Sequence, residues 1–234
     1  MEWTTDESIN RDVRSTFNRA LYHAYYTCGI ELQQENIRAL DSLYSRLIIL
    51  RDEAISRTNE PRANAALRAM LITSGAKNFL EMWVRLKEDD PTEAWLKLVA
   101  AQEAFTVAQR ICFDPLTDNL AQHLLSVQDI LFPPQIFASS GYTYSKALCT
   151  ICNVTYGECE HICGRLYMGK ICQREIIEAN LTEVSVVEHP NDKRCRITRI
   201  GTNGKVHCTL TRREVPQETP IDPEHDYISG VIPY

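Results

Sequence analysis

Five of the nine cysteines in this 234-residue chain lie close together in the sequence: Cys149, Cys152, Cys159, Cys163 and Cys172. Thiol clusters of this density bind metal in reducing compartments and form disulfides in exported proteins. The N-terminal segment carries Glu2 and Asp6, where a signal peptide would carry positive charge. We therefore expect a cytoplasmic protein in which the cluster holds a metal ion.

The spacing of these residues indicates a zinc site. Two cysteines separated by two residues, Cys149 and Cys152, present both sulfurs from one tight turn at about 2.3 Å from the metal. Cys159 and His161 are the candidates for the other two ligands, because the order C-x2-C-x6-C-x-H closes a compact loop. Cys172 is the reserve ligand, and Cys163 is the weakest of the candidates.

The expected zinc is structural rather than catalytic. A hydrolytic zinc site keeps an open position and an adjacent base, as in H-E-x-x-H or in the H-x-E and P-C-x-x-C pair of deaminases. Neither pattern occurs in this sequence, and Leu148 rather than proline precedes Cys149. We expect a non-catalytic protein, with a zinc-dependent hydrolase as the third-ranked alternative.

The run from Cys149 to Pro190 resembles a segment of uncharacterised bacterial and prophage-borne proteins. The shared pattern is C-x2-C-x5-6-C-x-H-x2-G-x2-Y-x-G-x2-C, followed by an E-V-S-hydrophobic-V stretch that ends in proline. Its second half is also similar to the E-V-S-L-V strand of tailed-phage prohead proteases. Such a protease needs serine and histidine on upstream strands, where this sequence is helical. We therefore do not infer protease activity from this similarity.

Apolar residues recur every three or four positions from Thr5 to about Phe132, a pattern typical of amphipathic helices. It predicts five helices, the third weakened in its middle by Gly75, the fourth capped by Asp90 and the fifth capped by Thr117. Five such helices joined by short polar turns predict an antiparallel bundle. Tetratricopeptide-like stacking ranks second, because no 34-residue repeat is present.

The C-terminal part predicts mixed structure. A short helix is expected over 176–181 and a strand over 183–188, followed by a hairpin of 195–200 and 205–211 around a turn at 201–204. Alternation along the two hairpin strands places Cys195 and Cys208 on the inner face.

The outer face of this hairpin is predicted to be basic and to bind a partner, through Arg194, Arg196, Lys205 and His207. Seven basic residues and one acidic residue give 191–213 a charge of +6, whereas the whole chain carries −6. Such a face can bind the phosphate backbone of a nucleic acid, the acidic surface of a partner protein, or acidic helices of the same chain.

Composition and patterning together predict an α+β protein with three parts. These are an all-α helical bundle (1–140), a small zinc-stabilised α+β domain with a β-hairpin (141–213) and an acidic, proline-containing tail (214–234). The 44% hydrophobic and 24% charged residues exclude general disorder, and no window reaches the apolar length of a membrane span. We expect an interaction or adaptor subunit of a bacterial or phage-related assembly that binds a protein partner, with nucleic-acid binding through 191–213 as the alternative.

Overall fold

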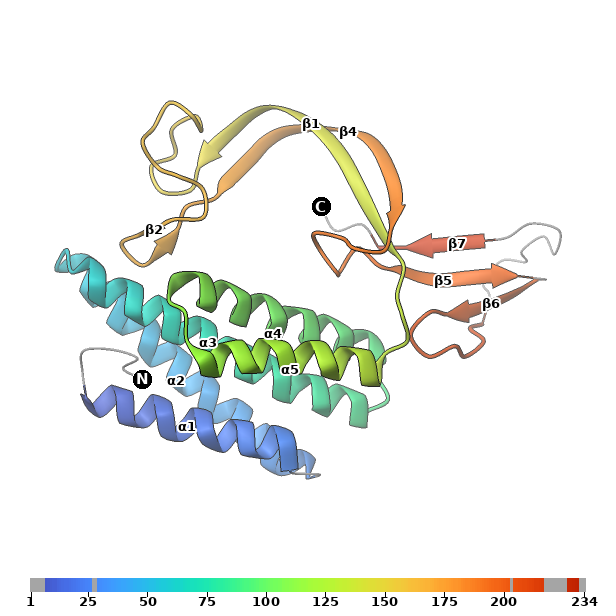
Figure 1. The fold of residues 1–234 in the computed structure, drawn as a ribbon, viewed down its shortest axis with the longest axis horizontal. Coiled ribbons are helices and arrows are strands. Elements are labelled where there is room, and N and C mark those ends of the chain that lie inside the picture. Colours follow the sequence, from blue (N-terminus) through green and yellow to red (C-terminus); the bar gives the residue numbers. More distant parts are fainter. Residues whose placement is uncertain (1–6, 27–28, 203, 217–226, 232–234) are drawn as a thin grey trace. The chain divides into compact units, whose positions relative to one another are not determined.

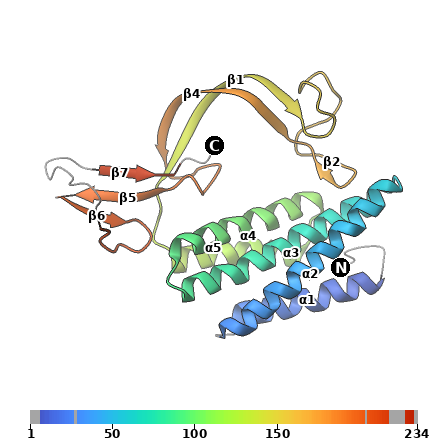
Figure 2. The same ribbon diagram turned by 180° about the vertical axis from the view of Figure 1, so that it is seen from behind.

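The described residues fold as five helices followed by short sheets, in the α+β class that the sequence predicts. The computed structural model describes residues 7–26, 29–202, 204–216 and 227–231. The helices are α1 (Glu7–Tyr26), α2 (Ile30–Ser56), α3 (Glu60–Lys87), α4 (Pro91–Ile111) and α5 (Pro115–Leu131), and α1 to α4 lie alongside one another (Figures 1 and 2). None of the described helices has the length and apolarity needed to cross a membrane.

Seven strands follow the helices in the part of the chain that the structure describes. They are β1 (Phe137–Cys149), β2 (Leu166–Tyr167), β3 (Lys170–Ile171), β4 (Arg174–Val187), β5 (Ile197–Thr202), β6 (Lys205–Cys208) and β7 (Tyr227–Gly230). β1 pairs with β4 in a long two-stranded ribbon, β2 with β3, and β5 lies between β6 and β7. The helix predicted over 176–181 is wrong, because these residues lie inside strand β4, which is hydrogen-bonded to β1.

By their internal contacts, the elements form two compact units. The first contains Met1–Leu125 and Lys146–Ile177, so the cysteine-rich segment belongs with most of the helices. The second contains Ser126–Ser145 and Glu178–Tyr234. The three domains expected from the sequence, 1–140, 141–213 and 214–234, are a statement about which segments fold independently, and they stay a prediction.

Polar side chains fix the starts of the helices. The predicted cap of α4 is confirmed, since Asp90 accepts a hydrogen bond from the backbone N–H of Glu93 at 3.1 Å. The predicted cap of α5 at Thr117 is wrong, because this residue lies inside the helix and its hydroxyl donates to the backbone carbonyl of Asp114 at 3.0 Å. Asp114 instead precedes the helix, and its side-chain carboxylate accepts a hydrogen bond from the N–H of Leu116 at 2.8 Å. The same carboxylate forms a buried ion pair with Arg68 of α3 at 3.2 Å.

The helix α3 forms the centre of the first unit and packs most extensively against α2 and α4. It runs without a break through Gly75, where the sequence permitted one. A Cβ atom at Gly75 would lie only 2.8–3.0 Å from ring atoms of Phe105 of α4. Alanines are also buried along both helices: Ala63, Ala66, Ala69 and Ala76 on α3, and Ala94, Ala101, Ala104 and Ala108 on α4. Small side chains therefore permit close packing of the two helices.

The second unit is built around the predicted hairpin, in which Thr202 pairs with Lys205. Its third strand, β7, comes from the tail that the sequence placed outside the folded domain, and it pairs with β5. A register shift between Ile197 and Arg199 marks a bulge in β5. Residues 217–226 and 232–234 of the predicted tail lie outside the described residues.

Gly75→Ala should lower the free energy of unfolding by about 1–3 kcal/mol, because the added methyl group overlaps the Phe105 ring. The higher helix propensity of alanine offsets only about 1 kcal/mol of this loss. Urea unfolding followed by circular dichroism measures the change. In a Phe105→Leu background the same substitution should cost clearly less, whereas an equal cost in both backgrounds would contradict the proposed overlap.

His123 of α5 should make stability depend on pH, because burial lowers its pKa below the ordinary value of 6.5. The unfolded chain then binds a proton at a higher pH than the folded chain does. Stability should fall as the pH drops from about 7.5 to about 5.5. Urea unfolding at these two pH values should show a smaller loss for His123→Gln than for the unmodified chain, and equal losses would exclude this role.

Candidate metal centre

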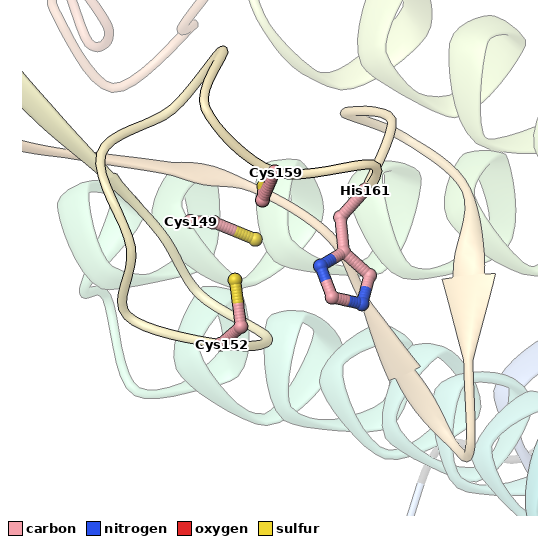
Figure 3. A group of neighbouring side chains, drawn as sticks. All are labelled: Cys149, Cys152, Cys159 and His161. Carbon is pink, nitrogen blue, oxygen red and sulfur yellow. The ribbon is translucent and has the colours of Figure 1, made fainter.

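Three thiols and one imidazole converge in the first unit. The Sγ atoms of Cys149, Cys152 and Cys159 and a ring nitrogen of His161 all lie within 4.8 Å of one another. Figure 3 shows the sulfurs of Cys149 and Cys152 and one imidazole nitrogen pointing toward a common centre. The structure thus brings together the four residues that the motif assigned, and this group could hold a metal ion.

The first two thiols are positioned by a turn at the end of β1. Cys149 is the last residue of this strand, and its N–H donates to the carbonyl of Val154 at 2.9 Å. The chain reverses direction between Cys149 and Val154. Asn153 in this turn has a φ of 59°, a left-handed conformation that asparagine tolerates better than most residues. The N–H of Ile151 donates to the Cys149 Sγ at 3.4 Å. This turn directs both sulfurs to the same side.

Two tyrosine hydroxyls hold the loop that carries Cys159 and His161. Tyr167 accepts a hydrogen bond from the N–H of Ile162 at 2.9 Å, and Tyr156 accepts one from the N–H of Cys163 at 3.2 Å. The ring of Tyr167 also meets the His161 imidazole edge to face, with centroids 4.7 Å apart. Tyr167 belongs to the sequence motif. Tyr156 was missed, because a single tyrosine between two cysteines carries no signal of its own.

The imidazole of His161 supplies an independent sign of a ligand. Its Nδ1 atom is buried and has no hydrogen-bond partner among the described residues. A buried polar atom without a partner costs about 1–3 kcal/mol. Coordination to a cation would satisfy this nitrogen, and three thiols with one imidazole form a donor set typical of tetrahedral zinc. The residues therefore fit the expected metal.

The buried thiols have strongly different acidities. Burial alone would raise the pKa of Cys149, but hydrogen bonds from the backbone N–H groups of Ile151 and Cys152, and from neighbouring thiols, lower it to about 6. Burial and the adjacent Cys149 sulfur raise the pKa of Cys172 to about 11. The opposite directions of these pKa shifts favour Cys149 over Cys172 as the thiolate of the pair, and a thiol must be deprotonated to bind a metal.

The two other cysteines of the motif lie outside the group of four. Cys172 is fully buried with its Sγ atom 3.8 Å from that of Cys149, in position to donate a weak S–H hydrogen bond. Cys163 is exposed. The geometry thus places the reserve ligand beside the cluster and the weakest candidate on the surface.

The turn between β2 and β3 attaches this segment to the helices. The N–H groups of Met168 and Gly169 donate to the side chains of Glu60 and Asn64, at 3.1 and 2.8 Å, at the start of α3. Gly169 has a φ of 70°, and a Cβ atom there would lie 3.1 Å from the Ala63 carbonyl oxygen. Glycine is required at this position because both the backbone conformation and the close approach exclude a side chain.

The predicted basic face is largely neutralised or buried. Arg194 pairs with Asp192 at 2.8 Å and Lys205 with Glu214 at 3.2 Å. The prediction that Arg196 lies on this open face is wrong: the residue is 3% exposed and donates to the hydroxyl of Thr209 at 2.7 Å.

Arg196 lies just before β5, where it pairs with Phe137 in an isolated antiparallel bridge and its guanidinium also donates to the side-chain oxygen of Gln135 at 3.3 Å. The following residue, Ile197, is buried as well. His207 is half-buried, as are Cys195 and Cys208, which were expected on the inner face.

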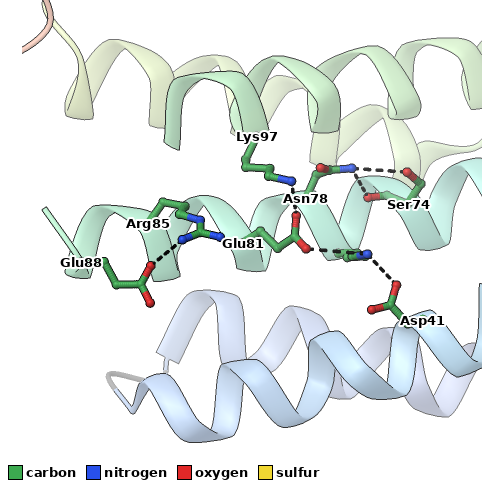
Figure 4. A network of polar contacts seen from close by, with 8 residues as sticks. Asp41, Ser74, Asn78, Glu81, Arg85, Glu88 and Lys97 are labelled. Carbon is green, nitrogen blue, oxygen red and sulfur yellow. Dashed lines mark hydrogen bonds and ion pairs between the residues drawn. The ribbon is translucent and has the colours of Figure 1, made fainter. Parts of the chain in front are cut away.

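A second polar cluster joins α2, α3 and α4 (Figure 4). Lys77 donates to Asp41 and lies near Glu81, which also pairs with Lys97 at 2.7 Å. Burial lowers the pKa of Lys77, but these carboxylates outweigh it and raise that pKa. The adjoining cavity of 140 Å³ is small for an organic ligand. Because its charges are paired across three helices, this cluster is structural.

Comparisons of the chain with protein-family models, with curated proteins and with solved structures find no match. The resemblance of 149–190 to bacterial and prophage-borne segments therefore stays a prediction.

Protein purified without chelator should contain one zinc ion per chain by elemental analysis. Cys152→Ser and Cys159→Ser should abolish zinc binding, because each removes one of four converging donors. Cys163→Ser is the matched control and should retain the metal, since its thiol is exposed and outside the group. A zinc content near zero in the unmodified protein, or equal loss in the control, would contradict this ligand set.

Proposed function

We propose that this chain is a non-catalytic adaptor subunit whose fold is stabilised by structural zinc. The observation that carries the proposal is the convergence of Cys149, Cys152, Cys159 and His161 within 4.8 Å. Four protein donors fill a tetrahedral shell, whereas a catalytic zinc keeps one position for water or substrate. A structural ion supports binding functions rather than hydrolysis. The free thiols fit a reducing compartment, so the proposal includes a cytoplasmic location.

The β1–β4 ribbon supplies the proposed binding surface. Nearly all of β4 is exposed, and an isolated two-stranded ribbon buries too little apolar surface to be more than marginally stable. Tyr142 and Tyr144 of β1 share one face because successive side chains alternate, and they are 51% and 46% exposed. Leu181 of β4 is 59% exposed. A partner that covers these side chains would stabilise the ribbon.

The charge of β4 indicates what such a partner carries. The exposed residues of this strand include three glutamates: Glu175, Glu178 and Glu183. An apolar surface flanked by basic side chains would complement both the tyrosines and these carboxylates. We therefore propose a protein partner of this chemistry, within a bacterial or phage-related assembly as the resemblance of 149–190 implies.

Nucleic-acid binding has less support. Arg194 and Lys205 are each paired with a carboxylate, and Arg196 is buried, so three of the four residues predicted for this role have other contacts. A phosphate would have to displace Asp192 or Glu214 to reach the first two. These contacts favour a protein partner over DNA or RNA.

Affinity purification of the tagged full-length chain from its native host should recover a defined partner that also binds when both proteins are purified. Tyr142→Ser combined with Tyr144→Ser should abolish this binding, because it removes the aromatic contact area. Thr143→Ala is the matched control and should bind normally, since the alternation of β1 turns its side chain to the opposite face.

Equal binding by the double tyrosine variant would contradict the ribbon as the docking surface. Tight binding of duplex DNA would contradict the adaptor proposal. In that case, removing each phosphate contact through Arg194→Gln or Lys205→Gln should reduce the slope of log affinity against log salt by about 1.

A further inference from the structure

A cavity of 390 Å³ lies in the first unit between the end of α4 and the segment 163–173. It is separate from the four converging donors. Apolar side chains from both sides line it: Val107 and Ile111 of α4, Leu166 of β2 and Ile171 of β3. This volume falls within the range of about 300–1,000 Å³ that small-molecule sites occupy, and such sites are mostly apolar with a few polar groups.

Two arginines supply the charge of this cavity. Arg110 from the last turn of α4 and Arg165 from the cysteine-rich segment both line it, and none of the described aspartates or glutamates does. Neither guanidinium has a hydrogen-bond or ion-pair partner among the residues that the structure describes. In a chain with a net charge of −6, two cations without carboxylate partners at one apolar cavity mark a local preference for anions.

We propose that this cavity binds a small molecule in which a phosphate or another dianionic group is attached to an apolar body. A guanidinium presents parallel N–H donors that fit phosphate oxygens, and two of them match a charge near −2. The end of α4 contributes about −0.5 charge from its free carbonyl groups, which the two arginines outweigh. The apolar walls disfavour free inorganic phosphate, because this ion has no apolar group to pack against them.

The cavity is coupled to the metal centre through one wall. Cys172 lines the cavity, and its Sγ atom lies 3.8 Å from the Cys149 Sγ. The backbone of Cys172 also forms hydrogen bonds with two other residues that line the cavity. Its carbonyl accepts from the N–H of Gly164 at 2.8 Å, and its N–H donates to the carbonyl of Arg165 at 2.9 Å. The position of Arg165 thus depends on the metal-binding loop, so this inference rests in part on the proposed zinc site.

Isothermal titration of the full-length chain with phenyl phosphate tests the proposal, with phenol and inorganic phosphate as separate probes. Phenyl phosphate should bind at least about tenfold more tightly than either probe, because only it offers both the dianion and the apolar body. Arg110→Gln and Arg165→Gln should each weaken binding by about tenfold or more. Arg38→Gln, an exposed residue of α2 outside the cavity, is the matched control and should bind normally.

Zinc content measured on the same samples separates this proposal from the proposed function. Zinc-loaded protein that does not bind phenyl phosphate at millimolar concentration, or that binds it equally after both arginine substitutions, overturns the cavity proposal alone. Zinc-free protein that binds phenyl phosphate through Arg110 and Arg165 overturns the zinc proposal and the coupling, and it leaves the cavity proposal supported.

Discussion

The convergence of four side chains that could hold a metal ion is the constraint on which the segment 146–177 depends. Its buried side chains are few, chiefly Ala147, Cys149 and Cys172, and they cannot form an apolar core. A segment of this size needs a metal or disulfides to hold one conformation. The turn at Asn153 and the two tyrosine hydroxyls place the donors, and binding of zinc would in turn fix these loops. The docking of Gly169 onto α3 and the position of Arg165 beside the cavity both follow from this local order.

The helices need no such ion, because α3 is buried along most of its length between α2 and α4. Small side chains allow the close approach, and Phe105 fills the space that Gly75 leaves. The buried pair of Arg68 and Asp114 joins α3 to the start of α5 and limits how these helices can pack, since breaking a buried ion pair costs about 3–5 kcal/mol. The helical part therefore supplies a rigid support for the cysteine-rich segment.

The second unit shows why net charge is a weak guide to function. The excess of basic residues in 191–213 suggested an open surface for phosphate, but the local fold places carboxylates beside two of them and turns Arg196 inward. Exposed apolar side chains are instead concentrated on the β1–β4 ribbon, including Tyr142, Leu181 and Val186. A group of side chains that could hold a metal ion, an exposed ribbon and basic residues paired with carboxylates are the observations behind the proposed adaptor role.

Features that depend on local spacing could be predicted from the amino-acid sequence. Helix periodicity, the Asp90 cap, the position of the hairpin and the convergence of Cys149, Cys152, Cys159 and His161 all follow from residues close together in the chain. The tertiary structure determines the features that depend on contacts between distant segments. Residues 176–181 belong to a strand because β4 can pair with β1, and β7 forms a strand because it can pair with β5. The burial of Arg196 and the placement of Arg110 and Arg165 at one cavity likewise required the folded chain, since no local pattern encodes which distant segments come together.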